Sequence, residues 1–490
     1  MGQYPWHGLL TIENESSIPV SLQIANAIIK EIHTGHMQPG TKLPGVLDAA
    51  QIFKVNKKTI EKAYSELSSQ QWVNILPKIG TFISDSLPAM KYQSLKNSSQ
   101  VVISTDPNYS LEEHHIDRFS EITNGNEIIF NDGLPDNRLI DHALINRTYR
   151  SILKLKSYRK LLSYTTSLGD EVLREVLAKY LNGTRGIPCR TENIMITRGS
   201  QMALYLSMSL LLRKEDVAIV SDPNYFFADE TLKYLNADIK KVKVDKNGIV
   251  VDEIEALCNK GKVRLVYVTP HHHHPTTVTL SADRRMHLLE LAERYRFAII
   301  EDDYDFDFHY KHNPILPLVS VNSNGSVIYI GSFSKTISPS FRIGYMVAPK
   351  KIIRQAADLR KIIDFQGDTI LERTIAQLID QGDLQRMVRK SLKEYRKRRD
   401  FLCDNLKLEL GQFFSFDKPS GGMAIWGKFS NDVCLKNLSS TARENNIVIS
   451  DGTPYRSDNC LRLGFASLEP AEMTNAVLIL KDILLKQVRE

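Results

Sequence analysis

A lysine surrounded by hydroxyl side chains is the chemically most suggestive feature of this 490-residue chain. Lys335 lies in the segment 331–345, Gly-Ser-Phe-Ser-Lys-Thr-Ile-Ser-Pro-Ser-Phe-Arg-Ile-Gly-Tyr. A lysine amine can form an imine with an aldehyde, and hydroxyls with a guanidinium can hold a phosphate dianion. The segment therefore predicts a site for an aldehyde cofactor that carries a phosphate, with Ser332 and Arg342 at the phosphate. The alternative is an ordinary surface lysine that follows a strand.

A helix start in another part of the chain suits the same phosphate. The segment 197–201 lies between an apolar strand and an apolar helix. Because the N-terminus of a helix offers free backbone amides to an anion, this segment predicts part of the phosphate site. We expect Gly199, Ser200 and Gln201 to contribute those amides and a hydroxyl group.

The segment around Lys335 closely resembles the Schiff-base lysine segment of fold-type I aminotransferases, which use pyridoxal 5'-phosphate (PLP). The resemblance implies that Lys335 forms the imine with PLP. It also implies that Asp302 keeps the pyridine nitrogen protonated, which makes the ring an electron sink, and that Tyr304 approaches the ring hydroxyl. Tyr225, in a segment that resembles the strand-end motif of the family, is expected to stack on the ring; ordinary loop packing is its alternative.

Two more segments resemble ligand-binding parts of aminotransferases. The segment 461–466 matches the one that supplies an arginine to the substrate carboxylate, which implies this role for Arg462. A guanidinium suits a carboxylate because it can donate two parallel hydrogen bonds. Tyr164 resembles a tyrosine that reaches the phosphate of a neighbouring subunit, so the site is expected to need a dimer.

Four consecutive histidines, 271–274, follow a strand in the middle of the chain. Consecutive residues cannot all face one ion, and no spacing of the HExxH kind is present, so we expect no metal site. In aminotransferases this loop carries an asparagine just before the proline, where it touches the cofactor ring. His274 takes that place here, and the resemblance therefore implies a cofactor-loop role for it.

The elements that must position these residues alternate between short apolar strands and amphipathic helices from about Glu127 onward. This alternation predicts an α/β domain with a mostly parallel sheet over 127–490, with a smaller α+β subdomain from about 371 to 490. The expected strands are Ile194–Thr197, Val217–Val220, Ile239–Val244, Val263–Val268, Phe297–Ile300, Val327–Ile330 and Ile343–Val347.

The front of the chain has a different pattern. Three apolar-faced helical segments and two short strands predict a winged helix-turn-helix over 15–85, and the polar stretch 86–126 is expected to be a linker. Asn56 is placed to cap the third helix. Positive charge gathers at the start of this helix, where a recognition helix would enter the major groove, although a solvated helix face is the alternative. The expected DNA contacts are Lys54, Asn56, Lys57, Lys58, Thr59 and Lys62.

The front segment resembles the winged helix-turn-helix of GntR-type regulators. The likeness includes the segment 39–44 before the second helix and the wing at 80–83. The family usually carries a serine and an arginine shortly after the proline, to grip phosphate, but Gly45, Val46 and Leu47 stand there in this chain. Some phosphate contacts are therefore expected to be lost or moved.

The bulk composition agrees with a protein that works in the cytoplasm. The formal net charge is +6, which is compatible with nucleic acid without being evidence for it. We find no apolar segment as long as a membrane span and no signal peptide at the start. The five cysteines include no CxxC pair, so we expect reduced thiols.

The two halves together resemble the MocR subgroup of GntR-type regulators over nearly the whole chain. This resemblance implies a PLP-dependent regulator that binds a double-stranded DNA operator, senses PLP or its adduct with an amino acid or other amino compound, and forms a head-to-tail homodimer. A catalytically active aminotransferase with a vestigial DNA-binding module is the alternative, and a vitamin B6 sensor that binds no amino acid is a third hypothesis. The lysine-rich helix and the long linker favour the regulator.

Overall fold

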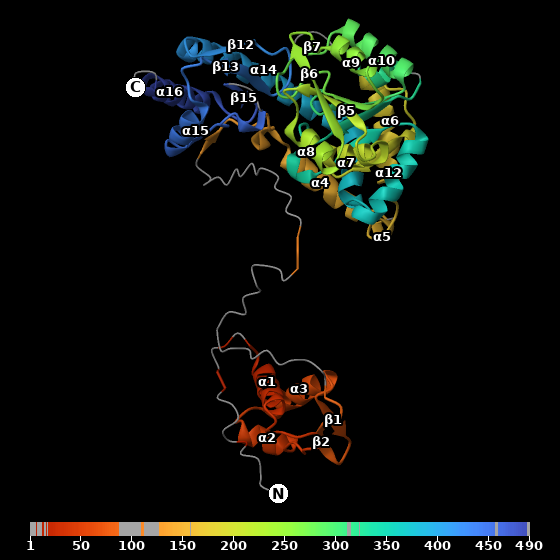
Figure 1. Ribbon diagram of the computed structural model, residues 1–490, viewed down its shortest axis with the longest axis vertical. Coiled ribbons are helices and arrows are strands. Elements are labelled where there is room, and N and C mark those ends of the chain that lie inside the picture. Colours follow the sequence, from red (N-terminus) through yellow and green to blue (C-terminus); the bar gives the residue numbers. More distant parts are fainter. Residues whose placement is uncertain are drawn as a thin grey trace. The chain divides into compact units, whose positions relative to one another are not determined.

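The computed structural model divides the chain into two compact units, Met1–His115 and Ile116–Glu490 (Figure 1). Most of the expected linker lies outside the residues that the structure describes. The described residues are 6, 12–13, 16, 18–87, 109–111, 127–156, 158–310, 315–322, 324–455 and 459–487.

The first unit contains three helices and a two-stranded antiparallel hairpin, as the sequence predicts. The helices are α1 (Val20–His33), α2 (Val46–Ile52) and α3 (Lys57–Ser69), and the hairpin joins β1 (Val73–Leu76) to β2 (Gly80–Ile83). Apolar residues at helical spacing on α1 and α3 meet in one core, which the hairpin closes. Fully buried members of this core are Ile24, Ile28, Ile60, Ala63 and Leu67.

An eight-stranded sheet forms the centre of the second unit. The strand order is β4-β11-β10-β9-β8-β5-β6-β7, and the central strands β10, β9, β8, β5 and β6 run parallel. The edge strand β7 and the inner strand β11 run antiparallel to their neighbours. The strands are β4 (Ile194–Thr197), β5 (Val217–Asp222), β6 (Asp238–Asp245), β7 (Gly248–Ile249), β8 (Val263–Val268), β9 (Ala298–Asp303), β10 (Val327–Ser332) and β11 (Gly344–Val347).

Each expected strand of this sheet is present, and the largest change is at the end of β9. The sequence predicts that this strand stops at Ile300, before the acidic residues, yet β9 continues to Asp303. Pairing with β10 keeps the backbone extended there, because Asp302 lies opposite Ile330 and Asp303 opposite Gly331. The carboxyl end of β9 thus carries three buried carboxyl groups, those of Glu301, Asp302 and Asp303.

Helices pack on the sheet and fill the sequence between its strands (Figure 1). α7 contacts β10 and β11, while α9 and α10 share an apolar core with β5 and β8. The helices of this part are α4 (His142–Leu153), α5 (Tyr158–Leu161), α6 (Glu171–Arg185), α7 (Gly199–Leu211), α8 (Phe226–Tyr234), α9 (Val251–Cys258), α10 (Ala282–Tyr295), α11 (Leu318–Val321) and α12 (Lys350–Ile363). Within the described ranges, no helix combines the length and apolar character that crossing a bilayer requires.

A smaller α+β part ends the second unit, with its own three-stranded antiparallel sheet. A two-residue strand from far earlier in the chain, β3 (Ile128–Ile129), joins this part by pairing in parallel with β14. The remaining elements are α13 (Thr369–Asp380), α14 (Asp383–Leu410), β12 (Phe414–Phe416), β13 (Ala424–Phe429), α15 (Leu435–Glu444), β14 (Ile447–Val448), β15 (Cys460–Gly464) and α16 (Pro470–Gln487).

The core of the large part continues past the expected boundary near residue 371. α13 packs against α4 and α6, and Ile375 and Leu378 lie in the same apolar cluster as Leu173 of α6. The first turns of α14 belong to this cluster through Leu384, whereas the later turns of α14 pack on the small sheet. α14 therefore connects the two parts.

Candidate ligand site and nucleic-acid interface

The predicted ligand residues lie at the carboxyl ends of the parallel strands. Asp302 lies near the end of β9, Lys335 three residues after β10, Tyr225 three residues after β5, and His274 in the loop after β8. Because these four strands are neighbours and parallel, their carboxyl ends meet at one edge of the sheet, where ligands bind in open α/β folds. The topology thus brings together groups that are up to 110 residues apart.

Asp302 is a buried carboxylate with one free oxygen. Its side chain is 3% exposed, Oδ2 accepts a hydrogen bond of 2.9 Å from the Tyr267 hydroxyl, and Oδ1 has no partner. Burial raises the pKa of the Asp302 carboxyl to about 7. A buried oxygen without a partner is costly for the fold, so its position suits a ligand that supplies an N–H.

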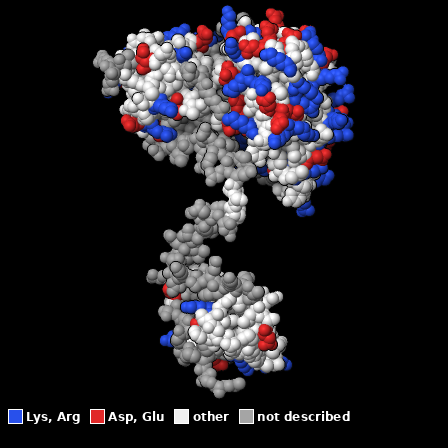
Figure 2. All heavy atoms as spheres, in the orientation of Figure 1, with Lys and Arg blue, Asp and Glu red and all other residues white. Residues whose placement is uncertain are grey.

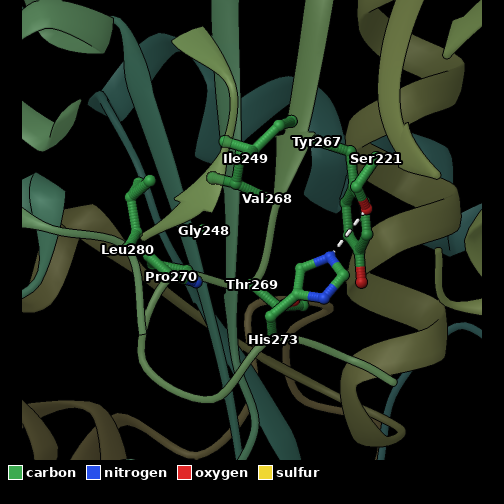
Figure 3. A pocket seen from close by; sticks show the side chains of 9 residues that line it. All are labelled: Ser221, Gly248, Ile249, Tyr267, Val268, Thr269, Pro270, His273 and Leu280. Atoms are coloured by element: carbon green, nitrogen blue, oxygen red, sulfur yellow. Dashed lines mark hydrogen bonds between the residues drawn. The ribbon is translucent and has the colours of Figure 1, made fainter. Parts of the chain in front are cut away.

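A small pocket lies beside Tyr267 (Figure 3). His273 lines it, with Nδ1 2.7 Å from the Thr276 hydroxyl and Nε2 2.8 Å from the Ser221 hydroxyl. Burial lowers the pKa of the His273 imidazole to about 3, so this ring is neutral and its nitrogens are used by hydroxyls. The lining of the pocket is therefore uncharged, and its Tyr267 side chain contacts the carboxylate of Asp302.

Lys335 reaches from the end of β10 into the same region. Its Nζ donates a 2.6 Å hydrogen bond to the carbonyl oxygen of Gly133 and lies 5.9 Å from the centre of the Tyr304 ring. Burial lowers the pKa of the Lys335 ammonium, although the charge of Asp132 opposes that shift. A depressed pKa increases the fraction of neutral, nucleophilic amine.

Two glycines and Arg342 pack closely together and form a cradle at the start of α7. Gly199 has φ +73°, and a Cβ there would lie 2.7 Å from the Arg342 guanidinium. Gly344 is equally constrained, because its Cβ would lie 2.6 Å from the carbonyl carbon of Gly199. No side chain caps this helix start, so its backbone amides remain available to an anion.

The other residues predicted for the phosphate are distributed around this cradle. The Ser332 hydroxyl donates to the Ser334 hydroxyl at 2.9 Å, and Ser200 is the second residue of α7. The Gln201 side chain turns away, because its amide nitrogen donates to the Thr231 hydroxyl of α8 at 3.0 Å. Only the backbone of Gln201 is therefore placed to contribute to the helix start.

Tyr225 and Tyr304 enclose the region from two sides. The Tyr225 ring, at the start of α8, meets the His274 ring edge-on with centroids 5.0 Å apart. The Tyr304 hydroxyl donates to the carbonyl oxygen of His272 at 2.8 Å. Both phenols stay protonated, because burial raises the pKa of each of them.

Arg462 of β15 is fully buried and its donors face groups of the chain itself. Nη1 donates to the carbonyl oxygen of Pro275 at 2.8 Å, and Nη2 lies 3.4 Å from the Tyr304 hydroxyl. Nε lies 3.0 Å from Oδ1 of Asp132. Sequence reasoning did not select Asp132, whose only local signal is a polar residue before the turn at Gly133.

Each of the four histidines has its own partner. His271 Nδ1 lies 3.1 Å from Asp303, His272 Nδ1 lies 2.8 Å from Asp305, and His274 Nε2 lies 2.6 Å from Asp132. His273 contacts the two hydroxyls described above. The imidazoles thus point to four separate places, and among the described residues no three metal-ligating side chains converge.

Tyr164 lies apart from these residues within its own chain. Its side chain is 82% exposed, and its ring contacts Phe365 edge-on at 5.0 Å. Leu162 and Ile362 are also exposed, at 63% and 84%. The prediction that Tyr164 acts in a neighbouring subunit stays a prediction, and its exposure leaves it free to do so.

In the first unit, α3 presents the predicted DNA contacts to solvent. Asn56 caps this helix as expected, because its Oδ1 accepts from the backbone N–H of Lys58 at 2.9 Å. Thr59 is partly buried. The exposed predicted contacts are Lys54, Asn56, Lys57, Lys58 and Lys62.

The positive charge of α3 is local. Only Lys57 has an acidic neighbour on this helix within ion-pair distance, Glu61 at 3.4 Å. The face of the first unit seen in Figure 2 carries few charges, while the second unit shows acidic and basic residues intermixed. Leu47, at the place where an arginine is usual, is 66% exposed. The expectation that some phosphate contacts are lost or moved stays a prediction.

Two sequence families match this chain. The family described as aminotransferase class I and II matches residues 135–480, and the family described as bacterial regulatory proteins, gntR family, matches residues 20–83. These ranges coincide with the second unit and with the helices and hairpin of the first.

Similar proteins span both parts of the chain or its larger part. The uncharacterized HTH-type transcriptional regulator YdfD of Bacillus subtilis is 26% identical over 92% of this chain and 93% of its own length. The probable rhizopine catabolism regulatory protein MocR of Rhizobium meliloti is 23% identical over 97% and 96%. The structure of Pyrococcus horikoshii kynurenine aminotransferase matches with a TM-score of 0.69 and 29% identity, over 74% of this chain and 92% of that one.

Proposed function

We propose, since this chain belongs to the aminotransferase class I and II family and carries a gntR-family domain in front, that it is a PLP-dependent transcriptional regulator. It binds operator DNA through α3 and responds to PLP or to an amino compound in the second unit. Full-length likeness to proteins named as regulators supports this proposal, because those proteins combine the same two parts.

The observation that carries the cofactor part of the proposal is the free oxygen of Asp302. Oδ1 of this buried carboxylate has no hydrogen-bond partner, and Lys335 lies at the same carboxyl ends of the strands. The residues fit PLP: Asp302 would hold the ring nitrogen, Tyr225 and His274 would flank the ring, and Arg342 would hold the phosphate. PLP supplies an aldehyde that reacts with amines and a ring that withdraws electrons.

The chain's own groups prepare this site before any ligand enters. Burial lowers the pKa of the Lys335 amine, and the Gly133 carbonyl orients it. The Tyr267 hydroxyl fixes the Asp302 carboxylate and leaves Oδ1 available. At the other end, the amides of Gly199, Ser200 and Gln201, with the Ser332 hydroxyl, would hold the phosphate.

A ligand can regulate DNA binding only if it binds two conformations of the protein with different affinity. Arg462 belongs to the small part and Lys335 to the large part, and α14 connects the two parts. Movement of the small part against the large part could therefore provide the two conformations. In a head-to-tail homodimer, with Tyr164 completing the neighbouring phosphate site, that movement would change the spacing of the two α3 helices.

A catalytically active aminotransferase is the second candidate function, because Lys335 and Asp302 also permit transamination. The exposed lysines and intact cap of α3 favour the regulator, since a vestigial domain has no reason to keep them. A sensor of PLP alone would need neither Arg462 nor an amino ligand.

The test combines spectroscopy with DNA selection on the full-length protein. Purified protein with added PLP should show a visible absorbance band that Lys335→Ala loses. Selection from a randomised duplex library should enrich one sequence, and Lys58→Ala/Lys62→Ala should weaken binding to that sequence. Absence of the band would overturn the cofactor proposal. Turnover of amino acids without any sequence enrichment would favour the aminotransferase.

A further inference from the structure

The carboxylate of Asp132 lies where the ligand site would be expected to receive a carboxylate from outside. Its Oδ1 is 3.0 Å from Nε of Arg462 and accepts a hydrogen bond of 3.2 Å from the Tyr455 hydroxyl. Its Oδ2 is 2.6 Å from Nε2 of His274. Although burial opposes it, His274 and Arg462 hold the pKa of Asp132 well below its usual range, so the group is ionised.

The backbone around Asp132 is held firmly to the strand that carries Arg462. The N–H of Gly464 donates to the carbonyl oxygen of Asn131 at 2.9 Å, and a Cβ at Gly464 would lie 2.4 Å from that oxygen. The Asn131 side chain accepts from the N–H of Gly133 at 3.0 Å and donates to the Ser467 hydroxyl at 2.7 Å. These hydrogen bonds fix the turn that carries Asp132.

Asp132 already lies against Arg462 as an ion-pair partner, although the Nε–H of Arg462 makes no well-aligned hydrogen bond. The arginine side chain is 1% exposed and contacts the Pro275 carbonyl, the Tyr304 hydroxyl and Asp132. The Asp132 side chain is 46% exposed, whereas the guanidinium against which it lies is buried. A ligand carboxylate at Arg462 would have to displace Asp132 or lie beside its negative charge, and both are unfavourable.

We infer that Asp132 is a specificity-determining residue that occupies the carboxylate position at Arg462, so that the site binds amines without a carboxylate in preference to α-amino acids. This inference rests on the proposed function, because it assumes an amino ligand at Lys335. It changes the role implied for Arg462 from binding the ligand to holding Asp132. An amine pays no electrostatic penalty beside Asp132, and its own positive charge is attracted there.

A matched pair of ligands tests the inference in the PLP-loaded, full-length protein. L-leucine and isoamylamine share a side chain and an amine and differ by one carboxylate. The dissociation constant of each is read from the change in the cofactor absorbance. We expect isoamylamine to bind at least tenfold more tightly than leucine, and Asp132→Asn to improve leucine binding at least tenfold without improving isoamylamine. Asp432→Asn, which removes an exposed carboxylate from the small part, should change neither.

A second arm needs no cofactor. Calorimetry with 4-methylpentanoate, the leucine analogue without the amine, should show no binding to the cofactor-free wild-type protein and measurable binding to Asp132→Asn or Asp132→Ser. Binding to the wild type that Arg462→Ala abolishes would overturn the inference, as would equal effects of Asp132→Asn on leucine and isoamylamine. Failure of the proposed function looks different, because the absorbance band itself would then be missing.

Discussion

Replacement of Asp302 by asparagine should affect the protein with and without cofactor in opposite directions at alkaline pH. The carboxyl has a pKa of about 7 in the folded protein, against an ordinary value of 3.8. Because the folded state binds this proton more tightly, the stability that Asp302 contributes is full below about pH 4 and is lost as the pH rises through 7. The loss amounts to about 4 kcal/mol, at about 1.4 kcal/mol for each tenfold change in affinity.

Asparagine removes the charge but places an N–H₂ group where Oδ1 has no partner. An unpaired buried amide costs about 1–2 kcal/mol. By pH 5 the wild type has already lost about 1.7 kcal/mol, so the cofactor-free Asp302→Asn protein should be about as stable as the wild type at pH 5 and more stable by about 2–3 kcal/mol at pH 8.5. With PLP, the variant loses a charge-assisted hydrogen bond, which should weaken PLP binding by roughly 10- to 100-fold.

Urea unfolding of the second unit at both pH values, with Asp432→Asn as a control, measures the first effect. Titration of PLP followed by absorbance measures the second. If Asp302→Asn destabilised the cofactor-free protein equally at pH 5 and pH 8.5, burial would not raise the pKa of the Asp302 carboxyl. Unchanged PLP affinity would show that Asp302 does not hold the ring nitrogen.

Three further predictions concern other parts of the chain. Gly199→Ala should weaken PLP binding at least tenfold without unfolding the protein, because its Cβ would meet the Arg342 guanidinium in the cradle. Gly183→Ala in the last turn of α6, where a Cβ meets nothing within 4 Å, should leave binding unchanged and stabilise the fold by about 0.5–1 kcal/mol. Lys58→Ala/Lys62→Ala should weaken DNA binding at every sequence and reduce the slope of log K against log salt by about 2; an unchanged slope would place DNA elsewhere. Asn56→Ala should cost the first unit about 1 kcal/mol through the lost cap, measurable by thermal unfolding.

Local sequence was sufficient wherever the physical cause is local. The helix cap at Asn56 depends on residues two positions apart, and the apolar runs that became β4 and β8 are buried strands whichever way the sheet is ordered. The types and spacing around Lys335 and Arg342 predict a site for a phosphate-bearing aldehyde, and this stays a prediction. The fold class can be predicted from the alternation of strands and helices along the chain, because the spacing of apolar residues differs between strands and helices.

Only the tertiary structure decided which distant groups became neighbours. The four histidines look alike in sequence, yet each is matched to a different partner by the way its loop crosses the sheet edge. Asp132 and Arg462 are 330 residues apart, and their contact exists because β3 and the following turn dock on the small part. Burial and charge pairing depend on all surrounding elements at once. The contact of Arg462 with Asp132 could therefore not be predicted from the segment around Arg462.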